Sequence, residues 1–303
     1  MGFSLFFNHL SLPSSTEDKG YILLFDAFQG VLQLNLNQDD DELFIYFDGN
    51  SLDNCKLAEN FTYGDFKTRL DHEQELDLLD FLQDIEDKSP FIEHVSDERV
   101  SELAELGPYF KDRPYENMDI FSLAWLESGI MLSLATEKVW QDHTISFFIS
   151  REKEHEPARC QVYNISKKNH ADLILDAMAE SIYDICPNAI FDDYFIEWYD
   201  ECKKEDKNKI KNMLVHCCDN NFQLGRPVID TLNDSEFPNM KEIRVGNAHA
   251  QSGKIRIFFA MDPNRKANIL IGFIKHSNDY SDYLKTADNL FKSRLSEDLN
   301  DDD

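Results

Sequence analysis

Hydrophobic and polar positions divide the first 185 residues into short strands and helices. Runs rich in Phe, Ile, Leu and Val, bounded by polar turns, predict strands at Phe3–Leu10, Val31–Leu36, Leu43–Phe47, Thr144–Ile149 and Cys160–Tyr163. Apolar residues at helical spacing predict helices at Tyr63–Arg69, Glu73–Ile85, Asp97–Leu106, Ile120–Leu126 and His170–Ile185. The pattern therefore predicts a mixed α/β domain over residues 1–185.

The remaining residues follow a different order of elements. We predict two helices at Phe191–Cys202 and Asp206–Cys218, followed by a loop at Asp219–Asp230 and a strand at Lys241–Val245. A hairpin of Lys254–Met261 and Ala267–Lys275 and a closing helix at Ser281–Arg294 complete the order. Antiparallel strands with helices on one face make an α+β sandwich. We therefore predict a second domain over residues 186–295 and an acidic, disordered tail over 296–303. The fold class of the whole chain is α+β, with two domains.

The distribution of charge supports this division. The chain has 303 residues, which suits one large or two ordinary domains, and a net charge of −28. Residues 201–295 carry 16 Lys+Arg against 12 Asp+Glu, whereas residues 1–200 carry 14 against 41. Such different charge in the two parts is most simply explained by two domains.

Several classes of protein are excluded by composition. No apolar run reaches the roughly 18 residues of a transmembrane helix, so no membrane association is expected. The first residues lack a basic region and predict a strand, not a signal peptide, and Phe6 stands where a myristoylation pattern requires a hydroxyl residue. Six scattered cysteines without a CxxC motif predict reduced thiols in a cytoplasmic protein.

Motifs for a cofactor or a metal ion are absent from the sequence. There is no P-loop, GxGxxG or GxSxG. The acidic run Asp39–Glu42 has neither the glycine nor the closing glutamate of an EF-hand, and it predicts a solvated loop between two strands. His72, His94 and His143 are isolated from other ligand residues and are expected at the surface or in packing. We therefore predict no cofactor and no metal, and no catalytic role for the first 185 residues.

Basic residues gather around the C-terminal hairpin. They lie just before, between and just after its two apolar runs, at Lys254, Arg256, Arg265, Lys266 and Lys275. A local reversal of charge in an acidic protein needs a reason, and the phosphate backbone of a nucleic acid is the commonest one.

A set of motifs in the same region carries a family resemblance. In order, they are Leu-Gly-Arg-Pro at 224–227, the stretch from Asp230 to Arg244 with Ser-x-Phe-Pro-Asn-x-Lys-Glu-x-Arg, the stretch from Arg256 to Arg265, Gly-x-x-Lys at 272–275, Tyr280, and Ala287-Asp288. In this order and spacing, residues from about 191 to 295, a third of the chain, resemble the RelE/HigB-like toxins of bacterial toxin–antitoxin modules. The resemblance implies a small α/β sandwich with a curved antiparallel sheet and two N-terminal helices. It also implies cleavage of messenger RNA, usually in the ribosomal A site.

RNA cleavage without a metal uses the ribose 2′-OH as the nucleophile. A base helps to remove its proton, an acid helps the leaving 5′-oxygen, and cations stabilise the phosphorane. A sheet bearing Lys241, Arg244, Arg256 and Lys275 suits the last requirement. Glu242 and Arg244 share one face of their strand, whereas Lys241 lies on the other. This favours Arg244 and Arg256 as the inner phosphate-binding residues.

The remaining candidate residues each have two interpretations. Glu242 is either a general base or the ion-pair partner of Arg244. Tyr280 either stacks on a base or donates a proton, or it only packs before the closing helix. His249 suits acid–base work or is solvated, and Arg265 contacts RNA or the ribosome or is a hairpin residue. Lys254 and His276 complete the predicted RNA-binding set, together with Lys241, His249 and Arg265.

The predicted partners are messenger RNA and the ribosome, with either a cognate antitoxin or the chain's own N-terminal domain as inhibitor. An acidic domain can compete with RNA for a cleft that binds mostly by charge, and fusion raises its effective concentration to about the millimolar range. Such a switch would suit phage defence. Two other hypotheses stay open: an inactive domain that binds a ribosome or a protein, and an acidic half that mimics nucleic acid.

Overall fold

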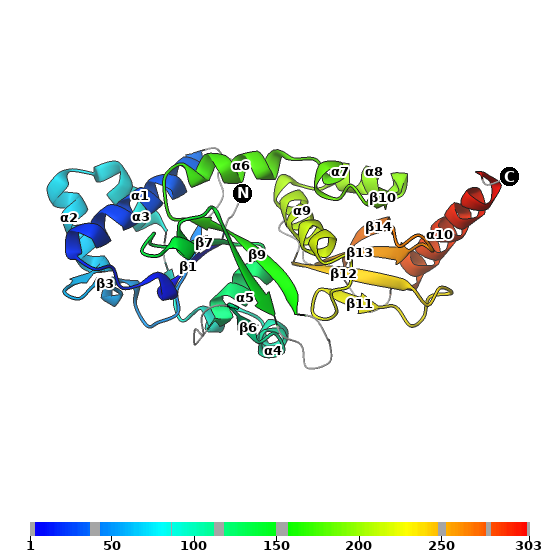
Figure 1. Cartoon of the computed structure of the whole chain (residues 1–303), viewed down its shortest axis with the longest axis horizontal. Helices are drawn as coiled ribbons and strands as arrows, with labels where there is room; N and C mark the ends of the chain where they lie inside the picture. Colours follow the sequence, from blue (N-terminus) through cyan, green and yellow to red (C-terminus); the bar gives the residue numbers. More distant parts are fainter. Residues whose placement is uncertain are drawn as a thin grey trace. The chain divides into compact units, whose positions relative to one another are not determined.

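The computed structural model describes residues 4–36, 43–85, 87–111, 118–149, 157–247, 253–276 and 280–301. The chain forms two compact units, Met1–Ala179 and Glu180–Asp303. Each unit has its own sheet, and Figure 1 follows the elements along the sequence by colour.

The first unit contains a mixed seven-stranded sheet, in the order β5-β2-β1-β7-β9-β8-β6. Neighbours from β5 to β9 are parallel, whereas β8 and β6 extend the sheet by antiparallel pairing. The predicted mixed α/β class is therefore confirmed for this unit. The strands are β1 Ser4–Phe7, β2 Phe44–Tyr46, β5 Asp87–Lys88, β6 Pro108–Tyr109, β7 Ile130–Leu132, β8 Thr144–Ile149 and β9 Ala158–Ile165, with a separate pair β3 Lys56–Ala58 and β4 Phe61–Thr62.

Six α-helices accompany these strands in the described part of the unit. They are α1 Glu17–Leu36, α2 Tyr63–Glu73, α3 Leu76–Asp84, α4 Asp97–Ala104, α5 Asp119–Leu126 and α6 His170–Ala179. Local sequence explains where α2 begins, because Thr62 and Asp65 form a capping box. Thr62 Oγ1 accepts from the Asp65 amide at 3.2 Å, and Asp65 Oδ2 accepts from the Thr62 amide at 2.9 Å.

The strand predicted at Val31–Leu36 is wrong, because these residues form the last turns of α1. Polar and apolar residues alternate over this stretch, which imitates a strand. The helical stripe is longer: buried residues recur three or four positions apart at Tyr21, Leu24, Phe28, Val31 and Leu34. The acidic run Asp39–Glu42 lies outside the described residues, and the element before it is a helix, not the expected strand.

The single helix predicted at His170–Ile185 is also corrected. The structure has α6 and then a short helix α7, Ile182–Ile185, which belongs to the second unit. The Ser181 hydroxyl accepts from the Asp184 amide at 3.2 Å and begins α7. An N-cap serine therefore starts a new helix where the apolar pattern alone suggests one continuous helix.

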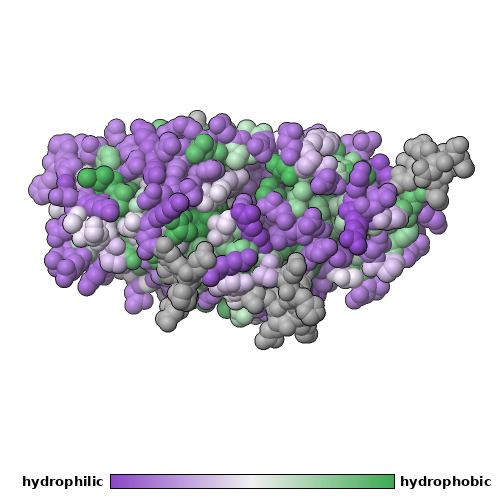
Figure 2. All heavy atoms as spheres, in the orientation of Figure 1, coloured by the Kyte–Doolittle hydropathy of each residue, from purple (hydrophilic) through white to green (hydrophobic). Residues whose placement is uncertain are grey.

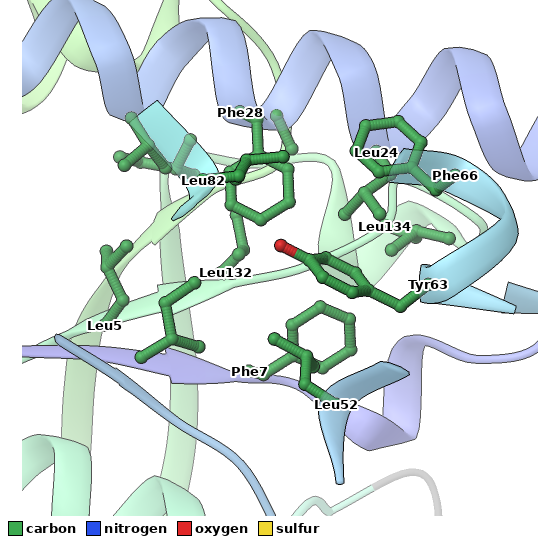
Figure 3. Packing of buried hydrophobic residues seen from close by; sticks show 14 of the residues in the cluster. Leu5, Phe7, Leu24, Phe28, Leu52, Tyr63, Phe66, Leu82, Leu132 and Leu134 are labelled. Atoms are coloured by element: carbon green, nitrogen blue, oxygen red, sulfur yellow. The ribbon is translucent and has the colours of Figure 1, made fainter. Parts of the chain in front are cut away.

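Aromatic and aliphatic side chains from β1, α1 and α2 fill the core of the first unit (Figure 3). Phe7, Phe28 and Phe66 are completely buried, and the rings of Phe28 and Phe66 stack with centroids 6.1 Å apart. Burial of each such side chain contributes about 1.5–3 kcal/mol. The packing of α1 and α2 over the sheet therefore depends on these rings.

The second unit has a five-stranded sheet in the order β10-β14-β13-β12-β11. All neighbours are antiparallel except β10, which runs parallel to β14. Its elements are β10 Ala189–Phe191, α8 Asp193–Glu201, α9 Lys204–Asp219, β11 Ile229–Thr231, β12 Met240–Asn247, β13 Lys254–Met261, β14 Ala267–Lys275 and α10 Ser281–Asp301. The predicted hairpin strands coincide with β13 and β14.

Helices cover both faces of this sheet, so the prediction of helices on one face is wrong. Trp198 of α8 lies so close to Gly272 that a Cβ there would be 2.0 Å from its ring. Phe273, the next residue, points to the opposite face and stacks on Tyr283 of α10. The physical reason is that β13 and β14 are buried along most of their length, on both faces, and each face must be covered.

The face drawn in Figure 2 is largely hydrophilic, with hydrophobic residues in small patches. Within the residues that the structure describes, no helix is both long and apolar enough to cross a membrane. The six cysteines, all of them in described positions, are free thiols.

Candidate functional site

Strand register gathers charged side chains on one face of the second sheet. Arg244 of β12 is opposite Arg256 of β13, and Arg256 is in turn opposite Phe273 of β14. Directly opposite residues share a face, with Cβ atoms about 4.5–5.5 Å apart. The same face, by alternation along each strand, carries the set that we call the charged face: Glu242, Arg244, Lys254, Arg256 and Lys275.

A β-bulge shapes the end of β12 beside these residues. The register with β13 shifts between Arg244 and Gly246. Gly246 has φ 121°, a conformation that side chains other than glycine rarely adopt. A bulge bends its strand and redirects neighbouring side chains, so Gly246 helps to set the position of Arg244.

Glu242 lies at the centre of the charged face. Its Oε1 is 3.9 Å from Arg244 Nε and its Oε2 is 3.7 Å from Arg256 Nε. The residue is 5% exposed, and within the described residues no group donates a hydrogen bond to Oε2. Burial raises the pKa of the Glu242 carboxyl, while the positive charges of Arg256, Arg244 and Lys275 act in the opposite direction. The positive charges of the two arginines therefore offset part of the cost of burying this carboxylate.

The two arginines differ in how accessible they are. Arg256 is 3% exposed, and its Nη1 donates to the carbonyl oxygen of Ile255 at 2.8 Å. The Arg244 side chain is 16% exposed. A ligand at this face would therefore meet Arg244 before it meets Arg256.

Lys275 and Tyr280 lie together beside the arginines. Lys275 Nζ is 4.7 Å from the centroid of the Tyr280 ring, a cation–π contact. Burial and the neighbouring cations lower the pKa of Lys275, although Glu242 raises it. The Tyr280 ring also packs on Phe258, with centroids 5.7 Å apart, and burial followed by the charge of Glu242 raises the pKa of its hydroxyl. Tyr280 thus packs against the apolar ring of Phe258 and also contacts the charged Lys275.

The other predicted RNA-binding residues lie elsewhere, apart from Lys254. Lys241 is opposite Phe259, on the face away from Arg244. Arg265 is exposed in the β13–β14 turn, with φ 62°, at the far end of the hairpin from the Lys254–Lys275 pair. His276 is exposed directly after β14, and His249 lies outside the described residues.

Several motif residues organise the fold. The Asp288 carboxylate accepts from the Ser235 hydroxyl at 2.5 Å and from the Glu236 amide at 3.1 Å, which ties the loop before β12 to α10. Asp262 Oδ1 accepts from the Lys266 amide at 2.8 Å and closes the hairpin turn. The Ala-Asp and Asp-Pro motifs are therefore explained by structure alone.

Three residues near the site are not among the predicted site residues, although two of them, Arg226 and Asp230, belong to the quoted motifs. Asp230 is opposite Glu242 and accepts from Arg226 Nε at 2.9 Å, so a second ion pair lies at the β11 side. Tyr283, three residues after Tyr280, stacks on Phe273. The spacing of the two tyrosines on either side of the predicted start of the closing helix was the only signal for Tyr283.

A metal ion does not suit this arrangement. No group of three or more His, Cys, Asp or Glu side chains that could hold a metal occurs in the described ranges. The carboxylate of Glu242, with Asp230 opposite it on β11, lies among four cations, and such an excess of positive charge is the reverse of what a divalent cation requires. An anion such as a phosphate suits it better.

Comparison with known proteins finds a family match within this unit. Residues 197–292 match the family described as "Phage derived protein Gp49-like (DUF891)". "Putative toxin HigB3" of Mycobacterium tuberculosis is 51% identical over 55 residues, which are 18% of this chain and 44% of that protein. "Putative toxin HigB2" of the same organism is 36% identical over 77 residues, 24% of this chain and 37% of that protein.

The chain thus spans less than half the length of either of these relatives. No solved structure matches it significantly, and the residues before 197 have no family assigned to them by the match. Residues 197–292 form a Gp49-like domain that is similar to the HigB toxins of Mycobacterium tuberculosis.

Proposed function

We propose that the C-terminal unit is a ribonuclease that cleaves messenger RNA, in association with the ribosome and without a metal ion. The observation that carries this proposal is the charged face, where four cations lie with Glu242 on one side of the sheet next to Tyr280. The similarity to HigB toxins supports the same assignment.

In this proposal the cations bind and stabilise the reacting phosphate. Arg244 is the more exposed arginine and makes the direct contact, with Lys275 beside it. Arg256 acts from within the protein, where its charge is less screened by water. Cations that are already in position stabilise the phosphorane without reorganising. In such sites this electrostatic stabilisation usually contributes the largest part of the rate enhancement.

Glu242 is the proposed general base. It takes the proton of the ribose 2′-OH as that oxygen attacks phosphorus, and the bond from phosphorus to the 5′-oxygen breaks. The leaving oxygen receives a proton from Lys275 or Tyr280, whose side chains are in contact. A raised pKa makes a carboxylate a stronger base near neutral pH, and Glu242 has that direction of shift.

Residues 1–185 are the proposed regulator. With 41 Asp+Glu against 14 Lys+Arg in residues 1–200, the N-terminal part can compete with RNA for a cationic site. Control by a separate antitoxin is the other possibility, and removal of the first unit distinguishes the two.

The test uses full-length protein and residues 180–303, each with and without Arg244→Ala, expressed from an inducible promoter in bacteria. The fragment begins at 180 because α7 packs on α9 and is part of the second unit. Growth and messenger-RNA 5′ ends are followed together. We expect new 5′ ends and growth arrest with the fragment, less of both with the full chain, and neither with Arg244→Ala.

Lys285→Ala, an exposed change on α10, is the matched control for loss of one positive charge. Equal arrest by Arg244→Ala and the unchanged fragment would contradict the proposed site. Equal arrest by the fragment and the full chain would contradict regulation by the first unit.

A second candidate function is binding without catalysis. The observation that favours it is the burial of both Glu242 and Arg256, at 5% and 3% exposed, as expected of a structural ion pair. In that case the folded fragment binds RNA or ribosomes, with weaker binding after Arg244→Ala, and neither the fragment nor the full chain produces new RNA ends.

A further inference from the structure

We infer that Tyr283, supported by Phe273, is a stacking platform for one unpaired RNA base beside the charged face. This inference rests on the proposed function, because it names how the same site holds its substrate. It adds a residue with a defined role in binding and in the choice of nucleotide.

The two rings form a nearly parallel stack. Their centroids are 4.1 Å apart and their planes differ by 8°. Other contacts of Phe273 are steeper, at 79° with Phe258 and 39° with Tyr280. Among these ring contacts of Phe273 in the described part of the chain, the one with Tyr283 thus has the geometry of stacked bases.

Tyr283 is the outer ring of the pair. Phe273 is 3% exposed, whereas Tyr283 is 45% exposed. Because Phe273 covers one side of the Tyr283 ring, the exposed area must come from its opposite side and its edges. An aromatic ring that is packed on one side and exposed on the other can stack on a base at little cost in side-chain entropy.

The stack of Tyr283 on Phe273 lies on the same face of the sheet as the proposed phosphate-binding residues. Phe273 is directly opposite Arg256 in the β13–β14 register, and Lys275 follows two residues later on the same face. Tyr283 lies in the first turn of α10, next to the buried Leu284, which anchors the helix to the sheet. A nucleotide with its phosphate at Arg244 and Lys275 therefore has an aromatic ring nearby for the base of that nucleotide or its neighbour.

Stacking determines the class of substrate. It requires a base that is not paired in a duplex, so the ligand is single-stranded RNA. The stacking energy depends on the size of the base and not on its hydrogen-bonding edge. We therefore predict a preference for a purine at one position, and no requirement for a fixed sequence. Loss of such a stack costs about 1–3 kcal/mol, which is roughly 5- to 150-fold in affinity.

The experiment uses the full-length protein and single-stranded 2′-O-methyl RNA, which has no free 2′-OH and is not cleaved. A fluorescent 2-aminopurine is placed at each position in turn, because its emission is quenched when it stacks. Tyr283→Ala and Tyr283→Phe are compared with the unchanged protein at low salt. Tyr194→Ala is the matched control, since Tyr194 is 57% exposed on α8, which covers the opposite face.

We expect the unchanged protein to quench 2-aminopurine at one position of the RNA. Tyr283→Ala should abolish this quenching and weaken binding at least about fivefold. Tyr283→Phe and Tyr194→Ala should keep both the quenching and the affinity. Equal quenching and affinity with Tyr283→Ala would overturn the inference, as would absence of binding by the folded, unchanged protein. RNA cleavage in cells, measured separately, tests the proposed function. The stacking inference and the proposed function therefore have separate measurements, and the failure of one can be told from the failure of the other.

Discussion

The carboxylate of Asp288 accepts a 2.5 Å hydrogen bond from the hydroxyl of Ser235, 53 residues earlier in the chain. Asp288 is 7% exposed and also accepts from the Glu236 amide. This contact fixes the loop before β12 against α10, the two elements that flank the charged face. It therefore links stability of the unit to the geometry of its site.

Asp288→Ala should destabilise the second unit by about 1–3 kcal/mol, because the Ser235 hydroxyl and the Glu236 amide lose a buried, charged acceptor. Urea unfolding followed by tryptophan fluorescence measures the change. Asn289→Ala, at the exposed neighbouring position, should change stability by no more than about 0.5 kcal/mol. Equal effects of the two substitutions would show that the contact with Ser235 contributes nothing.

Gly272→Ala should be strongly destabilising for a steric reason. The added Cβ would lie 2.0 Å from the Trp198 ring, so α8 or β14 would have to move. Overpacking of this kind costs about 1–3 kcal/mol. Thermal unfolding should show the loss, and Trp198→Leu in the same chain should recover part of it, since the smaller side chain leaves room. A double variant that is no more stable than Gly272→Ala would rule out the steric explanation.

Glu242→Gln tests the proposed base. A base must be deprotonated to act, so the rate of RNA cleavage should rise with pH through the Glu242 pKa, which burial raises above its ordinary value. The substitution should lower the rate about 10²- to 10⁴-fold and remove this rise. Glu197→Gln makes the same change at an exposed position on α8 and should leave the profile unchanged. An active Glu242→Gln protein with the original pH profile would assign Glu242 to ion pairing alone.

His216 should make the second unit sensitive to acid. It is buried, and burial lowers its pKa from the ordinary 6.5 to about 3. Between these two values the unfolded chain takes up a proton that the folded protein does not. The stabilising contribution is therefore present above pH 6.5 and is lost as the pH falls towards 3, by about 1.4 kcal/mol per pH unit.

The comparison is between the unchanged protein and His216→Gln, by urea unfolding at pH 5, 6 and 7. The variant should lose less stability between pH 7 and 5, whatever its stability at pH 7. His276→Gln, an exposed position in the same unit, should keep the original pH dependence. Identical slopes for all three proteins would mean that His216 is protonated in the folded state.

Long apolar runs were the part of the fold that could be predicted from sequence most closely. β13 and β14 are mostly apolar strands of eight and nine residues separated by an Asp-Pro turn, and this pattern predicts their limits. Two strands of three residues, β7 and β10, contain too few positions to show a period, and the sequence pattern does not predict them. The six residues at the end of α1 fit both the strand period and the helix period, and only packing of the whole helix decides between them.

The candidate site divides in the same way. Alternation along β12 is a local property, so the sequence alone determined that Glu242 and Arg244 share a face and that Lys241 does not. Which residues of β13 and β14 join them depends on register, and the bulges at Gly246 and at Phe258–Phe259 set that register in three dimensions. The burial of Arg256 and the stack of Tyr283 on Phe273 were decided only by the tertiary structure, because both depend on residues that are distant in the chain and meet through the packing of α10 on the sheet.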